Sequence, residues 1–163
     1  MSYGVDKTSS NYISEKDYIK INERSAVNTG DILISMIGTV GIVSLIIENP
    51  VDFAVKNVGI YRTSLNPNLQ YYIHCFLKSE NTQGYIASHL AGTTQKYISL
   101  GELRNLSLSI PSNDELEKFN KIVTPMYSKI ISNTRENEKL IQLRDTLLPK
   151  LMNGEINVEK IQP

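Results

Sequence analysis

One long helix near the carboxyl terminus is the strongest structural prediction from this 163-residue sequence. Ser112 and Glu115 form a capping box, in which a hydroxyl and a carboxylate each satisfy a free backbone amide at the helix start. Pro149 and Gly154 mark the end of the helical pattern. A helix over 112–152 is longer than a small domain is wide, so we expect it to pack against something outside its own domain.

The apolar residues of this helix fall in two rows spaced seven apart, as at the a and d positions of a coiled coil. Polar residues interrupt the seam, and a buried polar residue fixes register and partner orientation at a cost in stability. We therefore expect one defined helical partner. The predicted seam consists of Phe119, Val123, Met126, Ile130, Asn133, Asn137, Leu140, Leu147 and Leu151, with Arg144 at a further core position.

Pro125 leaves the continuity of this helix open, because proline removes one backbone hydrogen bond and can kink a helix. The alternative is two shorter helices that break at Pro125 and fold onto a local core.

The first part of the chain is predicted to be a mixed domain, with strands concentrated in its first half. Short apolar or alternating runs, bounded by glycine and Asn-Pro turns, indicate the strands, and apolar residues at helical spacing indicate the helices. The expected elements are strands 32–35, 42–47 and 58–63, helices 69–78 and 83–90, one helical turn at 100–104, and a strand at 106–110.

The predicted fold class is therefore α+β. A β-rich domain over residues 1–111 is followed by a long coiled-coil-forming helix over 112–152 and a tail over 153–163.

Composition restricts the possible functions. Seventeen basic and seventeen acidic side chains cancel, so the chain lacks the net field of a protein that binds nucleic acid mainly through phosphates. A single cysteine, Cys75, excludes a disulfide framework and a cysteine zinc site. The sequence shows neither a membrane span nor a signal peptide, which favours a cytoplasmic location.

The sequence lacks the motifs of self-contained cofactor chemistry. It contains no glycine-rich dinucleotide or triphosphate motif, no His-Glu-x-x-His zinc motif, and no adenine methyltransferase signature. We interpret His74, Cys75 and His89 as structural residues, because no pattern implies the geometry of a nucleophile paired with a histidine. We therefore expect no catalytic residue and no metal site.

Five stretches, taken together, resemble the specificity subunit of type I restriction-modification systems. Their order along the chain, more than any one of them, carries the resemblance. They are Gly-Asp-Ile-Leu-Ile-Ser at 30–35, Ile-Gly-Thr-Val-Gly at 37–41, Ala-Gly-Thr-Thr-Gln-Lys-Tyr-Ile at 91–98, Leu-Ser-Leu-Ser-Ile-Pro at 106–111 and Leu-Arg-Asp-Thr-Leu-Leu-Pro-Lys-Leu-Met-Asn-Gly-Glu-Ile at 143–156.

The resemblance implies a non-catalytic, DNA-reading subunit. Such subunits carry two target recognition domains, each followed by a long helix, and the two helices pair antiparallel. This sequence holds one such unit and lacks the customary first strands, so we expect a half-length or truncated subunit. A homodimer through 123–151 would restore the two-domain layout and favour a target with related half-sites.

The resemblance also implies partner subunits. Modification subunits would bind S-adenosylmethionine and methylate adenine, and a restriction subunit would use ATP and Mg²⁺ to translocate and cut DNA. This chain would bind none of these cofactors itself. We expect it to bind double-stranded DNA and to direct these partners to a target.

The residues expected to contact DNA are polar side chains on loops. Alternatives remain open: Gly38 and Gly41 as hairpin or bulge residues, Tyr97 and Ile98 as core residues, and Lys20 and Arg24 as solvated surface charges. The candidates are Thr93, Thr94, Gln95, Lys96 and Tyr97 in one loop, Ser35 and Thr39 in another, and Tyr12, Lys20 and Arg24 near the amino terminus.

Two other functions remain open. The chain could be a dimeric coiled-coil adaptor without a DNA role, which its neutral net charge favours, or an enzyme with an unrecognised site. The DNA target, the modification subunit it serves, the extent of the natural gene, and whether the shortened domain still binds DNA are not determined by the sequence.

Overall fold

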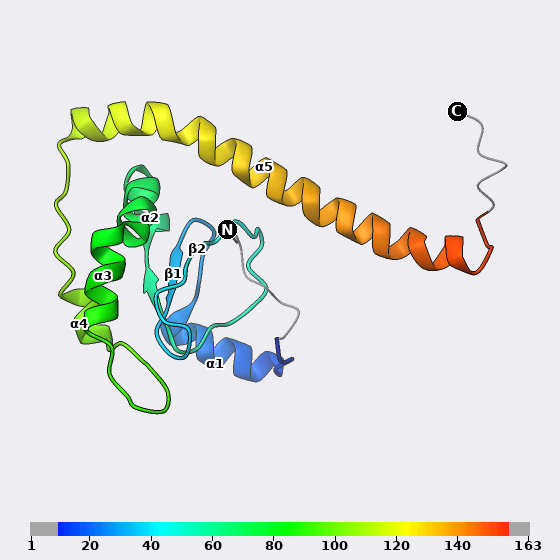
Figure 1. Ribbon diagram of the computed structural model, residues 1–163, viewed down its shortest axis with the longest axis horizontal. Helices are drawn as coiled ribbons and strands as arrows, with labels where there is room; N and C mark the ends of the chain where they lie inside the picture. Colours follow the sequence, from blue (N-terminus) through cyan, green and yellow to red (C-terminus); the bar gives the residue numbers. More distant parts are fainter. Residues whose placement is uncertain (1–9, 157–163) are drawn as a thin grey trace. The chain divides into compact units, whose positions relative to one another are not determined.

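The computed structural model describes residues 10–156. Contacts divide the chain into two units, residues 1–124 and residues 125–163. The first unit contains a small sheet and several short helices, and the second contains most of the long helix α5 (Asn113–Met152) (Figure 1). The division lies inside α5, so the first turns of this helix belong to the recognition domain predicted for 1–111. Most of the predicted tail over 153–163 lies outside the described residues.

The sheet of the first unit has three antiparallel strands. They are β1 (Ile32–Ser35), β2 (Val43–Leu45) and β3 (Val58–Tyr61), in the order β2-β1-β3. Leu33 of the central strand lies opposite Ser44 on one side and Ile60 on the other. All three predicted strands are therefore confirmed, with the second and third shorter than expected.

The central strand is buried on both faces of the sheet. Ile32 and Ile34 project from one face and Leu33 from the other, because side chains alternate along a strand, and all three are buried. Leu33 packs with Val27 and Ile46 in a core cluster. Burial on both faces explains why β1 is a continuous apolar run. Each fully buried large apolar side chain stabilises the fold by roughly 1.5–3 kcal/mol.

Three α-helices follow the sheet: α2 (Gln70–Lys78), α3 (Glu80–Ser88) and α4 (Leu100–Arg104). Two short 3-10 turns, η1 (Thr63–Leu65) and η2 (Pro67–Leu69), lead into α2. Ser79 and Ser99 cap α3 and α4 with their side-chain oxygens. Leu77, Ile86 and Leu103 are the buried large apolar residues of these helices. The predictions for this region are confirmed, with α3 starting and ending slightly earlier than expected.

A further helix, α1 (Glu15–Ser25), is absent from the elements expected above. Ser14 caps it by accepting a 3.1 Å hydrogen bond from the amide of Asp17. No residue of α1 is fully buried. Its inner face consists of Tyr18, Ile21, Asn22 and Ser25, which are half-buried, and only the first two of them are large apolar residues, so the apolar stripe is short.

The strand expected at 106–110 is wrong, because residues 105–112 have no regular secondary structure. The alternation is still visible, with Leu106 and Leu108 half-buried and Ser107 and Ser109 exposed. Tyr72 donates a 2.7 Å hydrogen bond to the carbonyl of Ser109. The alternation therefore matches the burial of Leu106 and Leu108 but not that of Ile110, which is 59% exposed, and no strand among the described residues provides ladder hydrogen bonds.

The long helix α5 starts as predicted and continues through Pro125. The amide and hydroxyl of Ser112 donate hydrogen bonds to the Glu115 carboxylate, at 2.8 and 2.7 Å, and the amide of Glu115 donates to the Ser112 hydroxyl. These contacts lower the pKa of Glu115. The alternative of two helices broken at Pro125 is wrong. None of the described helices is long and apolar enough to cross a membrane.

Candidate nucleic-acid interface

The fold joins two of the three segments predicted to contact DNA. The turn between β1 and β2, residues 36–42, lies against the loop between α3 and α4, residues 91–98. Gly38 donates a 2.9 Å backbone hydrogen bond to Lys96, and Ile98 donates one of 2.9 Å to Met36. Segments far apart in sequence thus form one surface, called the paired loops below.

The loop 91–98 is a hairpin with an exposed tip. Ala91 and Tyr97 exchange backbone hydrogen bonds of 2.9 and 3.0 Å at its base. Gly92 has a φ of +87°, and a Cβ atom there would lie 2.2 Å from the carbonyl oxygen of Gln95. The close neighbour of this glycine is therefore the loop's own backbone, and its role is to let the hairpin turn.

Four predicted contact residues, Thr93, Thr94, Gln95 and Lys96, occupy the hairpin tip. All four are exposed, and within residues 10–156 their side chains make no hydrogen bond or ion pair. The tip therefore presents two hydroxyls, an amide and a cation to a ligand. That they contact DNA stays a prediction.

The turn 36–42 is held by Ser35. Its hydroxyl donates a 2.5 Å hydrogen bond to the carbonyl of Thr39 and accepts one of 2.9 Å from the amide of Ile42. Ser35 is half-buried, whereas Thr39 is exposed. Of these two predicted contact residues, Thr39 is the one whose side chain is free to meet a ligand.

Gln83 of α3 braces the same turn. Its side-chain amide donates hydrogen bonds to the carbonyls of Gly41 (3.1 Å) and Leu77 (2.7 Å). Gly41 has a φ of +89°, and a Cβ atom there would lie 2.8 Å from the Gln83 Oε1 atom. The interpretation of Gly41 as a turn residue therefore holds.

Ile37 and Tyr97 lie opposite each other where the paired loops meet, as an isolated antiparallel bridge. Both are exposed, Ile37 to 40% and Tyr97 to 43%, whereas Ile98 is buried in the core. The core interpretation is therefore correct for Ile98 and wrong for Tyr97. Ile37 was not among the predicted contact residues, because its exposure follows from the pairing of the loops and leaves no signal in the sequence.

Asn57 directly precedes β3, next to the point where the paired loops begin. Its carbonyl accepts a 3.3 Å hydrogen bond from Met36, whose own carbonyl accepts from Ile98. Asn57 has a φ of +61°, a left-handed conformation that asparagine tolerates better than most residues. The exposed neighbours Lys56 and Asn57 thus flank the paired loops, and sequence reasoning missed both.

The third predicted set, Tyr12, Lys20 and Arg24, lies on a different segment. Tyr12 precedes α1, and Lys20 and Arg24 lie on it; all three are exposed. The α1 segment contacts the rest of the domain through Tyr18, which donates a 3.2 Å hydrogen bond to Val51. No hydrogen bond or ion pair among residues 10–156 joins these three side chains to the paired loops.

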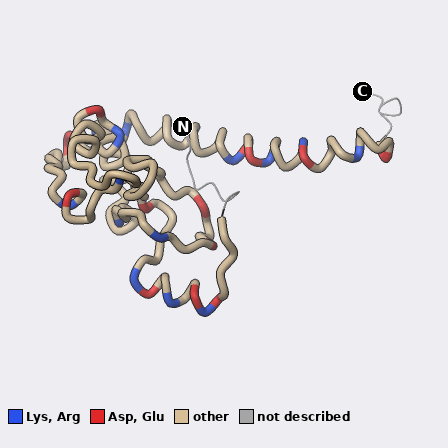
Figure 2. The backbone as a smooth tube through the Cα atoms, turned by 60° about the horizontal axis from the view of Figure 1, so that its bottom comes forward, with Lys and Arg blue, Asp and Glu red and all other residues tan. Residues whose placement is uncertain are grey.

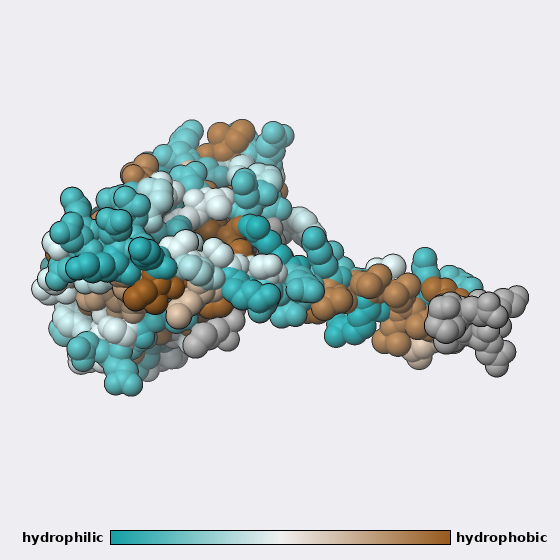
Figure 3. All heavy atoms as spheres, turned by 90° about the horizontal axis from the view of Figure 1, so that it is seen from above, coloured by the Kyte–Doolittle hydropathy of each residue, from teal (hydrophilic) through white to brown (hydrophobic). Residues whose placement is uncertain are grey.

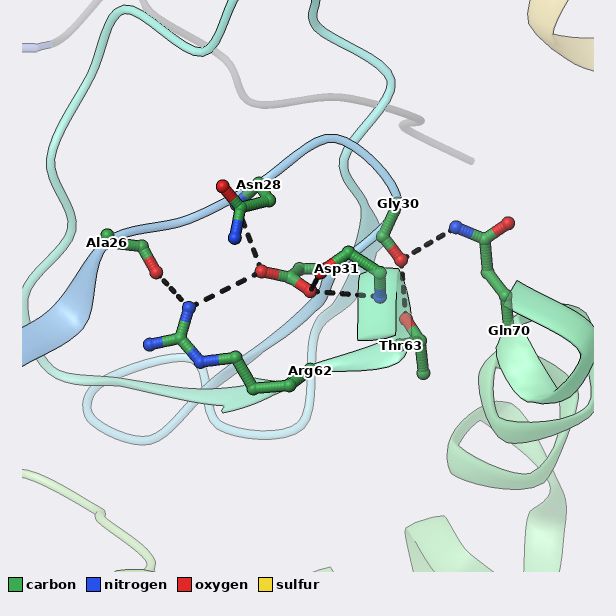
Figure 4. A network of polar contacts seen from close by, with 8 residues as sticks. Ala26, Asn28, Gly30, Asp31, Arg62, Thr63 and Gln70 are labelled. Carbon is green, nitrogen blue, oxygen red and sulfur yellow. Dashed lines mark hydrogen bonds and ion pairs between the residues drawn. The ribbon is translucent and has the colours of Figure 1, made fainter. Parts of the chain in front are cut away.

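A buried carboxylate organises the opposite end of β1 (Figure 4). Asp31 accepts hydrogen bonds from the amides of Asn28 (2.9 Å) and Ser64 (3.1 Å) and from the Ser64 hydroxyl (2.6 Å). Arg62 lies 3.5 Å from this carboxylate and also donates to the carbonyl of Ala26. The network ties the starts of β1 and η1 to the end of α1, so its role is structural.

The residues considered for catalysis lie in different surroundings. His74 is buried, and burial together with the charge of Lys78 lowers its pKa to about 4. Cys75 is exposed, and His89 stacks on Tyr85 with ring centroids 3.9 Å apart. Within residues 10–156, no group of three histidine, cysteine, aspartate or glutamate side chains could hold a metal ion.

The second unit presents an apolar helix surface. Every residue from Arg135 to Glu155 is exposed, and brown side chains gather along this part of α5 in Figure 3. Lys, Arg, Asp and Glu are distributed along the same helix in Figure 2. The exposed large apolar residues are Leu140, Ile141, Leu143, Leu147, Leu148, Leu151 and Met152.

The first part of the predicted seam packs within the first unit. Phe119 packs edge-on against Tyr72 of α2, with ring centroids 5.8 Å apart. Leu116 is buried, and the Asn120 side chain donates a 2.8 Å hydrogen bond to the carbonyl of Asn68. Met126 is exposed, but Tyr127 is buried and Ile130 half-buried, so the seam residues are consistently exposed only from Asn133 onward.

Residues 2–142 match the family described as Type I restriction modification DNA specificity domain. Three relatives are named as type I restriction enzyme specificity subunits. MjaIX of Methanocaldococcus jannaschii is 34% identical over 66% of this chain, HindI of Haemophilus influenzae 29% over 77%, and EcoBI of Escherichia coli 23% over 84%. The matched stretches span 24%, 27% and 30% of these relatives, respectively.

Proposed function

Because the chain belongs to the family of type I restriction-modification DNA specificity domains, we propose that it recognises a DNA sequence through its paired loops. On this proposal it is the non-catalytic specificity component that directs partner subunits to a target. The observation that carries the proposal is the backbone pairing of residues 36–38 with residues 96–98. Two loops that share hydrogen bonds can present their side chains to DNA as one rigid surface.

The exposed side chains on this surface suit the major groove of DNA. An amide such as Gln95 can make two hydrogen bonds to adenine, and threonine hydroxyls can donate or accept. Ile37 and Tyr97 add apolar area of the kind that contacts a thymine methyl group. Lys56 and Lys96 would contact phosphates and thereby position the loops. The neutral net charge suggests that partner subunits supply part of the phosphate attraction.

The chemistry would then belong to partner subunits. S-adenosylmethionine would bind to a modification subunit, and ATP with Mg²⁺ to a restriction subunit. A second copy of this chain would bind through α5, whose exposed apolar residues suit a helical partner. The adaptor alternative, with no DNA role, is not favoured, because the family is described by DNA specificity.

Selection from a random duplex library tests this function. The purified chain, alone and with a type I modification subunit, should enrich one sequence. Gln95→Ala should then reduce discrimination at one base pair by about 1–3 kcal/mol. Lys96→Ala should weaken binding to all sequences and reduce the salt slope by about one. Lys118→Ala, the same charge change on the exposed surface of α5, is the matched control.

Enrichment of no sequence in either condition would contradict the proposed function. Equal effects of Lys96→Ala and Lys118→Ala would place the DNA contact away from the paired loops.

A further inference from the structure

The hairpin 91–98 lies between two helices, with α3 before it and α4 after it. Backbone hydrogen bonds to the turn 36–42 hold its second half, through the carbonyl of Lys96 and the amide of Ile98. A hairpin that is held along one of its two legs can rotate about that leg. The direction in which its tip points therefore depends on how the helices fix the other leg.

Tyr85 joins these two helices. Its hydroxyl, in the last turn of α3, donates a 3.0 Å hydrogen bond to the carboxylate of Glu102, in the first turn of α4. Both side chains are half-buried. The adjacent residues Ile86 and Leu103 are buried in the core, so each end of the bond is attached to a helix that is itself packed. The bond thus closes residues 85–102 into a loop whose exposed part is the hairpin.

The Tyr85 ring is held in turn by His89, at which the chain leaves α3. The two rings stack with centroids 3.9 Å apart. The Nδ1 atom of His89 lies 2.8 Å from the carbonyl oxygen of Tyr85, and the backbone amide of His89 donates to the same carbonyl at 3.1 Å. A phenol held in one orientation has little side-chain entropy left to lose when it bonds to Glu102. The path of the chain into the hairpin is therefore coupled to this bond.

The same helix also supports the other loop. Gln83 donates a 3.1 Å hydrogen bond to the carbonyl of Gly41, in the turn 36–42. Tyr85 lies two residues further on, about 200° around the helix. Through these two side chains α3 contacts one of the paired loops and supports the other, so the position of one loop relative to the other depends on both.

We propose that Tyr85 and Glu102 are positioning residues for DNA recognition, because their hydrogen bond fixes the direction in which the hairpin presents Gln95. This inference rests on the proposed function and adds a pair of residues that act through the hairpin rather than by touching DNA. A hydrogen bond to a base edge needs a donor–acceptor distance of about 2.7–3.2 Å, whereas the attraction of a lysine to phosphate falls slowly with distance. Loosening the hairpin should therefore reduce sequence discrimination and leave the binding of unrelated DNA nearly unchanged.

Tyr85→Phe tests this expectation, because it removes the hydroxyl and keeps the ring that stacks on His89. Binding of the full chain is titrated with the selected duplex and with its single base-pair variants. Discrimination at the base pair that Gln95→Ala affects should fall by about three- to tenfold, which is part of what a paired amide contact supplies. The affinity for unrelated DNA and the salt slope should keep their wild-type values.

Two substitutions of Glu102 separate the hydrogen bond from the charge of the carboxylate. Glu102→Gln keeps an oxygen that can accept from Tyr85 and should retain most of the discrimination, whereas Glu102→Ala should lose as much as Tyr85→Phe. The double variant Tyr85→Phe, Glu102→Ala should lose no more than either single variant, because both substitutions remove the same contact.

Tyr72→Phe is the matched control. It removes a phenol hydroxyl that donates a 2.7 Å hydrogen bond to the carbonyl of Ser109, outside the paired loops. It should keep the wild-type discrimination. Circular dichroism verifies that each variant is folded, and Glu102→Ala gives the same readout if Tyr85→Phe does not fold.

Hydrogen exchange measures the support of the hairpin without DNA. The amides of Ala91 and Tyr97 are bonded across the base of the hairpin. They should exchange about two- to tenfold faster in Tyr85→Phe than in the wild-type chain or in Tyr72→Phe.

Four outcomes would overturn the proposal. They are unchanged discrimination in Tyr85→Phe, an equal loss in Tyr72→Phe, equal losses in Glu102→Gln and Glu102→Ala, and unchanged exchange of the hairpin amides. Unchanged discrimination with a sequence enriched by the wild-type chain would overturn this inference alone. Enrichment of no sequence would contradict the proposed function, and the exchange rates would still decide whether the bond holds the hairpin.

Discussion

The backbone amide of Gly38 donates a 2.9 Å hydrogen bond to the carbonyl of Lys96, joining two loops that the sequence separates widely. Together with the bond from Ile98 to Met36, it continues backbone pairing along the chain that follows β1, past Val58, the first residue of β3. The exposed threonines and Gln95 therefore project from a backbone fixed on both sides. Preorganised side chains can discriminate between base pairs with a smaller entropy cost on binding.

Gly92→Ala should disrupt the hairpin tip. A methyl group at this position would lie against the Gln95 carbonyl, and the backbone would keep a positive φ that alanine disfavours. We expect a loss of about 1–3 kcal/mol of stability in urea unfolding and weaker binding of the selected duplex. Gly84→Ala is the matched control, because it lies in α3 with open space around it and should stabilise by up to about 1 kcal/mol. Equal behaviour of the two variants would argue against this account of the loop.

Asp31→Ala should destabilise the recognition domain by about 2–4 kcal/mol. The buried carboxylate accepts hydrogen bonds from Asn28 and Ser64, whose amides would lose their partner. Denaturant unfolding of the full chain measures the change. Asp145→Ala serves as control, because its ion pair with Arg144 is exposed and is expected to contribute less than about 1 kcal/mol. Surface substitutions usually change stability by less than about 0.5 kcal/mol. A loss of this size for Asp31→Ala would show that the network is dispensable.

The elements predicted best from the sequence are those specified by neighbouring residues. Ser112 and Glu115 lie within one helical turn and specify the start of α5 between them. The apolar run 32–34 likewise specifies β1, because both faces of the sheet need apolar side chains there. In contrast, α1 buries no residue and was missed.

Features that depend on distant residues were not predictable in the same way. The strand expected at 106–110 has the right alternation but no partner, and strand pairing is a property of the fold. The paired loops and the contacts of Asp31 join residues about 30–60 positions apart, and no local pattern encodes such contacts. Candidate residues in the loops could be named from the sequence. Tyr97 was left open between a contact role and a core role, and the exposure of Ile37 had no sequence signal.

The buried imidazole of His74 should make stability depend on pH. Its folded-state pKa of about 4 lies below its ordinary value of 6.5, mainly because of burial and further because of Lys78. Between these values the unfolded chain binds a proton that the folded chain does not, so stability falls as pH decreases from about 6.5 to about 4. The loss for this group amounts to roughly 3 kcal/mol at most. Urea unfolding across this range should show a flatter profile for His74→Asn than for the wild-type chain, and an equally steep profile for the variant would argue against this account.

Leu140→Asp should dissociate the proposed dimer. The two symmetry-related copies each lose roughly 1.5–3 kcal/mol of apolar burial, so the dissociation constant should rise by about a hundredfold or more. Light scattering over a concentration series measures this shift. Gln142→Asp adds a carboxylate two residues further along the exposed helix, at a position that faces away from the seam, and should leave the mass unchanged. The two variants differ only in which face of α5 receives the carboxylate. Equal effects would therefore mean that the partner contacts a different side of α5.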